Sequence, residues 1–179
     1  MKKMTLTAGL IASLFLVSCA NQTIRPADVS EPAVWGASDN VVQLRHLYFS
    51  EQPDAETLRI AQARGVTTVI NMRDPAELDW DEKAAAEAAG LQYINIPIAK
   101  QSNTFDAEAI DRISAIVRES KGQPILLHCS SGNRAAGWLA IHLVEAHNLS
   151  EAQALRVASK AGLTSEVIES RVRNYLNSE

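Results

Sequence analysis

From residue 46 onward, the hydrophobic positions of this chain change between the spacing of β-strands and the spacing of α-helices. Short apolar runs bounded by glycine, proline or polar residues predict strands. The predicted strands are 46–50, 66–72, 91–98 and 124–129. Apolar residues at helical spacing, with capping residues before them and glycines after them, predict the helices. The predicted helices are 54–64, 76–89, 106–120, one that follows 134 and ends near 147, one capped by Ser150, and 164–176.

This order of elements predicts the class of the fold. Strands that alternate with helices form a mostly parallel sheet with helices on both of its faces. We therefore predict a three-layer α/β domain over residues 41–179, with a central sheet of about four or five strands. The apolar run Pro124–Cys129 is typical of a central, buried strand. Ligands of such sheets bind beyond the C-terminal ends of the strands, and Cys129 lies at such an end.

The start of the chain predicts export and attachment to a membrane. Residues 1–18 predict a signal peptide, because Lys2 and Lys3 precede an apolar run, Leu10–Val17, that is too short to cross a bilayer. The run ends in LVSC, which resembles the bacterial lipobox, where the signal is cleaved and the new N-terminal cysteine, here Cys19, is acylated. The alternative is a plain secretory signal that is cleaved nearby. Residues 19–40 lack a hydrophobic period, so we expect a lipid anchor and a tether.

The residue after Cys19 also bears on localisation. It is Ala20, whereas aspartate at this position in lipoproteins is linked to retention in the inner membrane. The resemblance therefore implies that acyl chains hold the protein on the periplasmic side of the bacterial outer membrane.

Charge and cysteine content narrow the possible functions. The formal net charge is −4, and the sequence contains no block of lysines and arginines, so we predict no nucleic-acid partner. The chain has two cysteines, and acylation of Cys19 leaves Cys129 without an intramolecular partner. Such a lone thiol is either a buried, inert residue or one that is kept for chemistry.

The segment from His128 to Arg134 is the strongest chemical signal, because it joins a buried strand to a helix. The N–H groups and the dipole of a helix N-terminus attract an anion and favour the thiolate form of a cysteine. Gly132 allows N–H groups to turn inward around an oxyanion, and Arg134 adds a planar, bidentate fork. The predicted substrate-binding residues are His128, Ser130, Ser131, Gly132 and Asn133. The alternative is a small buried cysteine before a turn, with Arg134 in solvent.

This loop resembles that of the cysteine-dependent protein tyrosine and dual-specificity phosphatases. The upstream segments QPDAETL, VINMRD and GLQYINIPI resemble the bacterial phosphatase-like domain of beta-lactamase-hydrolase-like proteins. The likeness spans Leu47–Ile98 and, with the loop, reaches Trp138. It implies a tyrosine-phosphatase-like fold and a phosphatase that requires no metal or other cofactor. By position, Cys129 is the nucleophile that forms a phospho-cysteine, and Arg134 binds the phosphate of a phosphorylated substrate.

The sequence departs from the phosphatase pattern at several positions. The spacing of the loop is C-x4-R, one residue shorter than the usual C-x5-R, which removes one N–H group from the cradle. The residue after the arginine is Ala135, where phosphatases carry serine or threonine. The place of the acidic aspartate, shortly after Pro97, holds Lys100. Asp106 is the nearest acidic replacement and our predicted general acid, although the helix dipole equally explains a carboxylate at a helix start.

A second resemblance keeps another reaction open. Loops of the form Cys-x-Ser-Gly-Asn-Arg occur in rhodanese-like sulfurtransferases, in which the cysteine carries a persulfide and no general acid is needed. This likeness implies a sulfur-bearing substrate and a persulfide on Cys129. A third alternative is a non-catalytic module that keeps the oxyanion cradle without turnover. Because the upstream segments follow the phosphatase pattern, we predict a hydrolase that acts on a phosphate monoester.

Overall fold

The computed structural model describes residues 23–178, so the predicted signal peptide and Cys19 lie outside the described part of the chain. The strands are β1 (Ala33–Trp35), β2 (Ser38–Leu44), β3 (Leu47–Ser50), β4 (Thr68–Asn71), β5 (Gln92–Asn95) and β6 (Ile125–His128). The α-helices are α1 (Ala55–Ala63), α2 (Glu82–Ala88), α3 (Ala107–Glu119), α4 (Asn133–His147), α5 (Glu151–Lys160) and α6 (Glu166–Leu176). Two short 3-10 helices are η1 (Pro26–Asp28) and η2 (Pro75–Glu77). Within residues 23–178, no helix is both long and apolar enough to span a membrane.

One six-stranded sheet forms the centre of the molecule, with the strand order β1-β2-β3-β6-β4-β5. The strands β3, β6, β4 and β5 run parallel, whereas β1, β2 and β3 follow one another antiparallel. β6 lies between β3 and β4, and His128 is in register with both Ser50 and Asn71. The predicted α/β class is therefore confirmed, and the sheet has more strands than expected.

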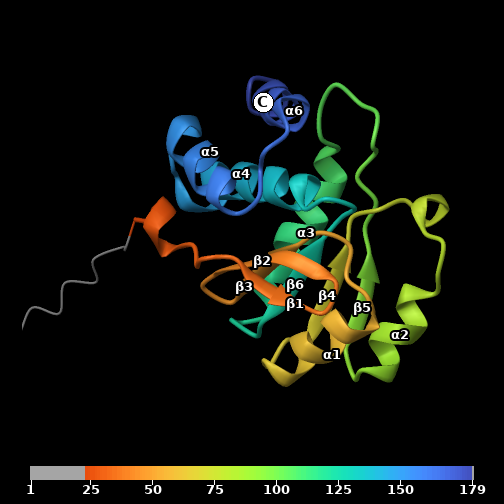
Figure 1. Ribbon diagram of the computed structural model, residues 1–179. Coiled ribbons are helices and arrows are strands. Elements are labelled where there is room, and N and C mark those ends of the chain that lie inside the picture. The colour runs from red at the N-terminus through yellow and green to blue at the C-terminus, as the bar shows by residue number, and fades with distance from the viewer. Residues whose placement is uncertain (1–22, 179) are drawn as a thin grey trace, which may run out of the picture.

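Side chains of β6 alternate between two hydrophobic layers on opposite faces of the sheet. Leu127 belongs to the larger cluster, which includes Trp138 from α4. Leu126 belongs to the other cluster, which includes Leu58 from α1. Figure 1 shows α1 and α2 on one side of the sheet and α4, α5 and α6 on the other. The molecule thus has the three layers that the sequence predicts.

Side-chain caps start several helices near the predicted positions. Asp54 accepts a hydrogen bond from Thr57 N (2.7 Å) at the start of α1. Ser150 and Gln153 form the predicted capping box of α5. The last helix, α6, is capped by Ser165 and so starts slightly after the predicted position. A cap depends on residues within one turn of each other, which is why sequence patterns locate it well.

The helix predicted over residues 76–89 is shorter in the structure. Its first part forms η2, which a capping box between Asp74 and Glu77 closes. Helix α2 begins after Asp81, whose side chain accepts a hydrogen bond from Ala84 N (2.9 Å). The first part of this prediction is therefore wrong. The alanine- and glutamate-rich composition favours a helix throughout, but Asp81 starts a new helix within it.

The tether predicted over residues 19–40 is wrong from residue 23 onward, because this segment is folded. Ile24 and Trp35 are buried, with exposed fractions of 5% and 2%. The strands β1 and β2 extend the sheet, and Trp35 packs against Tyr48 with ring centroids 5.1 Å apart. Ile24 and Val29 stand singly between polar residues and the run Ala33–Trp35 is short, so no hydrophobic period reveals the folded part.

Candidate active site

Cys129 follows the C-terminal end of β6, where the central strand turns towards helix α4. It is a free cysteine and is buried in the base of the loop. Gly132 caps α4 with a left-handed backbone (φ +78°), and a Cβ at this position would lie 3.4 Å from Ser50 O. Because glycine adopts this conformation without steric strain, Gly132 allows both the turn and its close approach to the end of β3.

Arg134 lies in the first turn of α4 and is 4% exposed. Its two terminal nitrogens each lie 2.8 Å from an oxygen of Glu77, so the two side chains form a bidentate ion pair. Nη1 also donates to Met72 O (3.2 Å) and Ile98 O (2.9 Å). Nη2 lies 3.4 Å from Ser130 Oγ in the loop. These contacts hold the guanidinium beside the loop, so the alternative of a solvated arginine is wrong.

The ion pair shifts the pKa values of both partners away from neutral pH. The hydrogen bonds that Arg134 donates lower the pKa of Glu77 to about 2, although partial burial by itself would raise it. Burial by itself would lower the pKa of Arg134, but its hydrogen bonds to Glu77 and the negative charges of Cys129 and Glu77 raise it. A permanent positive charge therefore lies near the thiol of Cys129.

Sequence patterns did not identify Glu77 as part of the site. Its position after Asp74 and Pro75 is explained by the capping box of η2, which uses the same carboxylate. The structure adds that Glu77 also contacts Arg73, with Oε2 3.8 Å from Arg73 Nε. Glu77 thus lies between Arg73 and Arg134, and only the folded chain brings these groups together.

A small cavity of about 130 Å³ opens over the loop. It is lined by Lys100, Ser130, Ser131, Asn133, Arg134, Ser165 and Ile168. Because a water molecule takes about 30 Å³ in the liquid, the cavity has room for a small polyatomic anion. Lys100 and Arg134 supply two cations to it, and none of the residues that line it is acidic. The place that phosphatases give to their acidic aspartate is therefore occupied by a lysine that borders the cavity.

Asn133, a predicted substrate-binding residue, ties the starts of two helices together. Its Oδ1 accepts hydrogen bonds from Thr164 N and Ser165 N, each at 2.8 Å, immediately before α6. Its Nδ2 lies 3.4 Å from Ser131 O within the loop. The side chain of Asn133 therefore orders the loop and brings Ser165 to the cavity.

Asp106, the predicted general acid, is exposed at the start of α3. Its carboxylate accepts a hydrogen bond from Glu108 N (3.3 Å), as the cap of a helix does. Asp106 is not among the residues that line the cavity over the loop. Capping explains its position, and its role as an acid stays a prediction.

His128, a predicted substrate-binding residue, is fully buried at the end of β6 and does not line the cavity. Its Nδ1 lies 3.4 Å from Cys129 O, and its Nε2 lies 2.6 Å from Oε1 of Glu82 in α2. Sequence patterns did not identify Glu82. A weak signal exists, because Glu82 shares a face of α2 with the buried Ala86, whereas Glu87 is exposed.

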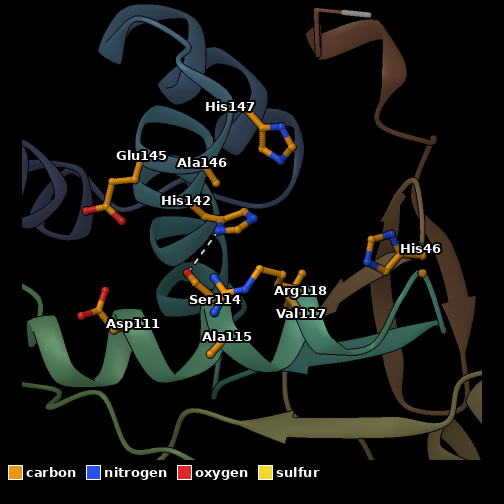
Figure 2. A pocket seen from close by; sticks show the side chains of 11 residues that line it. His46, Asp111, Ser114, Ala115, Val117, Arg118, His142, Glu145, Ala146 and His147 are labelled. Atoms are coloured by element: carbon orange, nitrogen blue, oxygen red, sulfur yellow. Dashed lines mark hydrogen bonds between the residues drawn. The ribbon is translucent and has the colours of Figure 1, made fainter. Parts of the chain in front are cut away.

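A larger hollow of about 840 Å³ lies between α3 and the C-terminal half of α4. In Figure 2, His142 and His147 line it from α4, Ser114 from α3, and His46 from the turn before β3. Nδ1 of His142 lies 3.1 Å from Ser114 Oγ. Because α4 rises about 1.5 Å per residue, this hollow is well separated from Cys129 at the other end of the helix. No residue of the loop that follows Cys129 lines this hollow, whereas Ser130 and Ser131 of that loop line the smaller cavity, so we place the candidate active site there.

Solved structures share this fold. TpbA from P. aeruginosa is 21% identical with a TM-score of 0.63, over 80% of this chain and 88% of that chain. A cysteine-to-serine variant of TpbA in complex with phosphotyrosine is 19% identical with a TM-score of 0.61, over 87% of this chain and 86% of that chain. Tk-PTP in its active form is 21% identical with a TM-score of 0.64, over 82% of this chain and 99% of that chain.

At the level of sequence, no curated protein matches the chain. A family described as "Beta-lactamase hydrolase-like protein, phosphatase-like domain" matches residues 41–146. The match includes most of β2, all later strands, the loop from Cys129 to Arg134 and nearly all of α4. Since it covers more than half of the sequence and includes the candidate site, the chain belongs to the phosphatase-like domain family of beta-lactamase hydrolase-like proteins.

Proposed function

We propose that the protein is a cysteine-dependent phosphatase that hydrolyses phosphate monoesters through a phospho-cysteine. One observation carries the proposal: the thiol of Cys129 and the guanidinium of Arg134 belong to one loop at the C-terminal end of the central strand. A small cavity with two cationic side chains lies over this loop. The family match supports the same reaction.

The reaction follows from these groups in two displacements. The Cys129 thiolate attacks phosphorus, so that an S–P bond forms while the bond to the leaving oxygen breaks and its electron pair goes to that oxygen. Arg134 and the N–H groups of the loop hold the phosphoryl oxygens. Water then attacks phosphorus, the S–P bond breaks, and the thiolate and inorganic phosphate are released. The proton lost by this water balances the proton gained by the leaving oxygen.

The lining of the cavity favours aryl esters as substrates. An alkoxide leaving group needs a proton from a positioned acid, whereas a phenolate leaves more easily without one. The residues that line the cavity include no carboxylate, and Lys100 offers a positive charge to a departing oxyanion. The complex of the TpbA variant with phosphotyrosine supports this class. We therefore propose phosphotyrosine or a related aryl phosphate as the substrate.

Attachment to a membrane is a further part of the proposal. The LVSC sequence supports acylation of Cys19 on the periplasmic side of the outer membrane. The buried residue Ile24 already belongs to the folded domain, and it follows Cys19 closely along the chain. An extended chain spans at most about 3.6 Å per residue, so the connection between the two is short. An acylated Cys19 would therefore hold the domain close to the lipid surface. Mass spectrometry of the mature N-terminus tests this, because Cys19→Ser should abolish acylation and release the protein from membranes.

Hydrolysis of para-nitrophenyl phosphate by the purified protein tests the enzymatic proposal. We expect turnover that is lost in Cys129→Ser, with aryl phosphates hydrolysed faster than alkyl phosphates. Thermal unfolding of the variant checks that it is folded. The family match does not favour the sulfurtransferase alternative. Lack of turnover would contradict the proposal. Incubation with thiosulfate would then test for a sulfurtransferase, which should form a persulfide on Cys129. A non-catalytic module should form no persulfide and should bind vanadate.

A further inference from the structure

Helix α6 forms part of the wall of the small cavity, although it lies outside residues 41–146, which match the phosphatase-like family. Ser165, which caps α6, and Ile168 in its first turn line the cavity. Lys100 lines it as well and belongs to the segment between β5 and α3. Figure 1 shows this segment, coloured green, beside α6. The contacts between the two therefore bear on where Lys100 lies.

Two side chains of α6 hold the end of this segment by its backbone. Nε and Nη2 of Arg171 both donate hydrogen bonds to Thr104 O, at 3.3 Å and 3.1 Å. Nδ2 of Asn174 donates to Asn103 O (2.8 Å). Because residues three apart lie on the same face of a helix, both side chains reach the segment together. Helix α6 thus fixes two consecutive carbonyl groups, a few residues after Lys100.

The surroundings of Arg171 do not suit a residue kept for stability alone. Arg171 is 2% exposed, and its guanidinium carbon lies 4.9 Å from the ring centroid of Phe105. Within the described residues it forms no ion pair, and its Nη1 has no hydrogen-bond partner. Burial lowers its pKa, and the positive charge of Arg134 lowers it further. Since an apolar side chain of similar volume often stabilises a protein more than a buried charge does, Arg171 is better explained by the segment that it holds.

The start of the same segment is held by Arg134. Its Nη1 donates a hydrogen bond to Ile98 O (2.9 Å), and Ile98 N donates to Met72 O (3.1 Å). Residues 99–103 between the two anchors are all exposed. Among them, Lys100 is the one that lines the cavity. A short exposed run, fastened at both ends by an arginine, therefore carries the second cation of the site.

We propose that Arg171 is a positioning residue that, together with Asn174, holds Lys100 at the cavity, so that Lys100 binds the same oxyanion as Arg134. A lysine on a free loop loses conformational freedom when it binds an anion, and a loop that is fixed in advance avoids much of this loss. The part of the proposal that concerns turnover rests on the proposed phosphatase function. The part that concerns binding of an oxyanion does not.

Binding of inorganic phosphate, measured by isothermal titration calorimetry at about pH 8, tests the proposal without any turnover. Lys100→Met should weaken binding about fivefold, because the cavity loses one of its two cations. Arg171→Lys keeps the buried charge but cannot hold Thr104 O with two nitrogens, so it should weaken binding about threefold. Phosphate binding that is absent, or that Lys100→Met does not change, would contradict the proposal.

The double variant separates positioning of Lys100 from any other effect of Arg171. Lys100→Met/Arg171→Lys should bind phosphate as Lys100→Met alone does, because the anchor has no effect once the cation that it positions is absent. If the two residues act independently, the losses multiply to about fifteenfold. That outcome would overturn the proposal.

Asn174→Ala keeps the proposal testable if Arg171→Lys does not fold, because Asn174 is exposed. It should weaken phosphate binding about twofold, and it should have no effect in the Lys100→Met background. The matched control is Asn177→Ala on the same helix. Nδ2 of Asn177 also donates over 2.8 Å, but to Arg173 O of α6 itself, so phosphate affinity should stay unchanged. Equal affinities in the two asparagine variants would rule out the anchoring role.

Kinetics with two aryl phosphates separate positioning from a purely structural role. Lys100→Met and Arg171→Lys should lower kcat more for phenyl phosphate than for para-nitrophenyl phosphate, because the poorer leaving group gains more from a nearby cation. If Arg171 is only structural, its replacement lowers the melting temperature and slows both esters equally, and the proposal fails. If the unaltered protein binds phosphate but hydrolyses neither ester, the proposed function fails, while the binding measurements still decide the role of Arg171.

Discussion

Helix α4 carries a buried polar side chain in each half, and the two meet different surroundings. Arg134 and His142 are 4% and 8% exposed. Arg134 faces the carboxylate of Glu77 and has a raised pKa, although burial by itself would lower it. The pKa of His142 falls to about 4, first because of burial and then because of positive charge at His147 and Arg118.

This difference shows that the partner decides whether the pKa of a buried base on this helix rises or falls. A carboxylate in bidentate contact compensates for the lost hydration of the guanidinium, so the N-terminal half of α4 keeps a permanent cation. A buried base without a carboxylate in contact loses its charge more easily, and the lowered pKa of His142 shows this. The chemistry proposed for Cys129 needs the first arrangement, because a phosphate ester requires a fixed cation.

Replacement of Arg134 by lysine should have the largest effect. Arg134→Lys keeps the positive charge but loses the planar fork that binds Glu77 and that the proposed reaction uses for phosphoryl oxygens. We expect kcat/KM for para-nitrophenyl phosphate to fall about 10²- to 10³-fold. The control is Arg112→Lys on the exposed side of α3, which should behave as the unaltered protein does. A loss of less than about twofold in Arg134→Lys would show that charge suffices and geometry does not matter.

The loss of the carboxylate partner should have the next largest effect. Glu77→Gln leaves Arg134 buried without its counter-charge, and we expect the free energy of unfolding at pH 7 to fall by about 2 kcal/mol. This is less than for a fully buried pair, because the Glu77 side chain is 17% exposed. Urea denaturation at several pH values measures it.

The pH dependence of this variant follows from the lowered pKa of Glu77. The pKa of about 2 in the folded state lies below the ordinary 4.5, so the stabilisation is present above pH 4.5 and is lost as the pH falls towards 2. Glu77→Gln has no carboxyl group at this position, so its stability should not show this decrease as the pH falls. Equal slopes of stability against pH in both proteins over this window would contradict the assignment.

The last of these predictions concerns the other half of α4. The pKa of His142 is lowered from 6.5 to about 4, so the unfolded chain binds more protons between these values and stability decreases as the pH falls through them. We expect a loss of about 2 kcal/mol over this window in the unaltered protein, and a smaller one in His142→Gln. Thermal or urea unfolding between pH 6.5 and pH 4 measures it. If His142→Gln keeps the full pH dependence, another group is responsible.

Local patterns predicted much of the fold and the core of the candidate site. The capping pair Ser150 and Gln153, the apolar strand before Cys129 and the glycine at 132 act within a few residues of one another. Asp106 shows the limit of such reasoning, because a helix cap and a general acid look the same in sequence. The strands β1 and β2 also escaped prediction, since β1 exposes the apolar Val34 and β2 buries the polar Ser38, so neither shows the usual alternation.

By itself, the sequence determined the strand, the loop and the helix around Cys129, because hydrophobic period, glycine geometry and capping depend on near neighbours. Only the tertiary structure decided that Glu77 pairs with Arg134 and that Glu82 pairs with His128. Each pair joins groups that are far apart along the chain, and a charge becomes strongly dependent on its partner only after folding has removed the water around it.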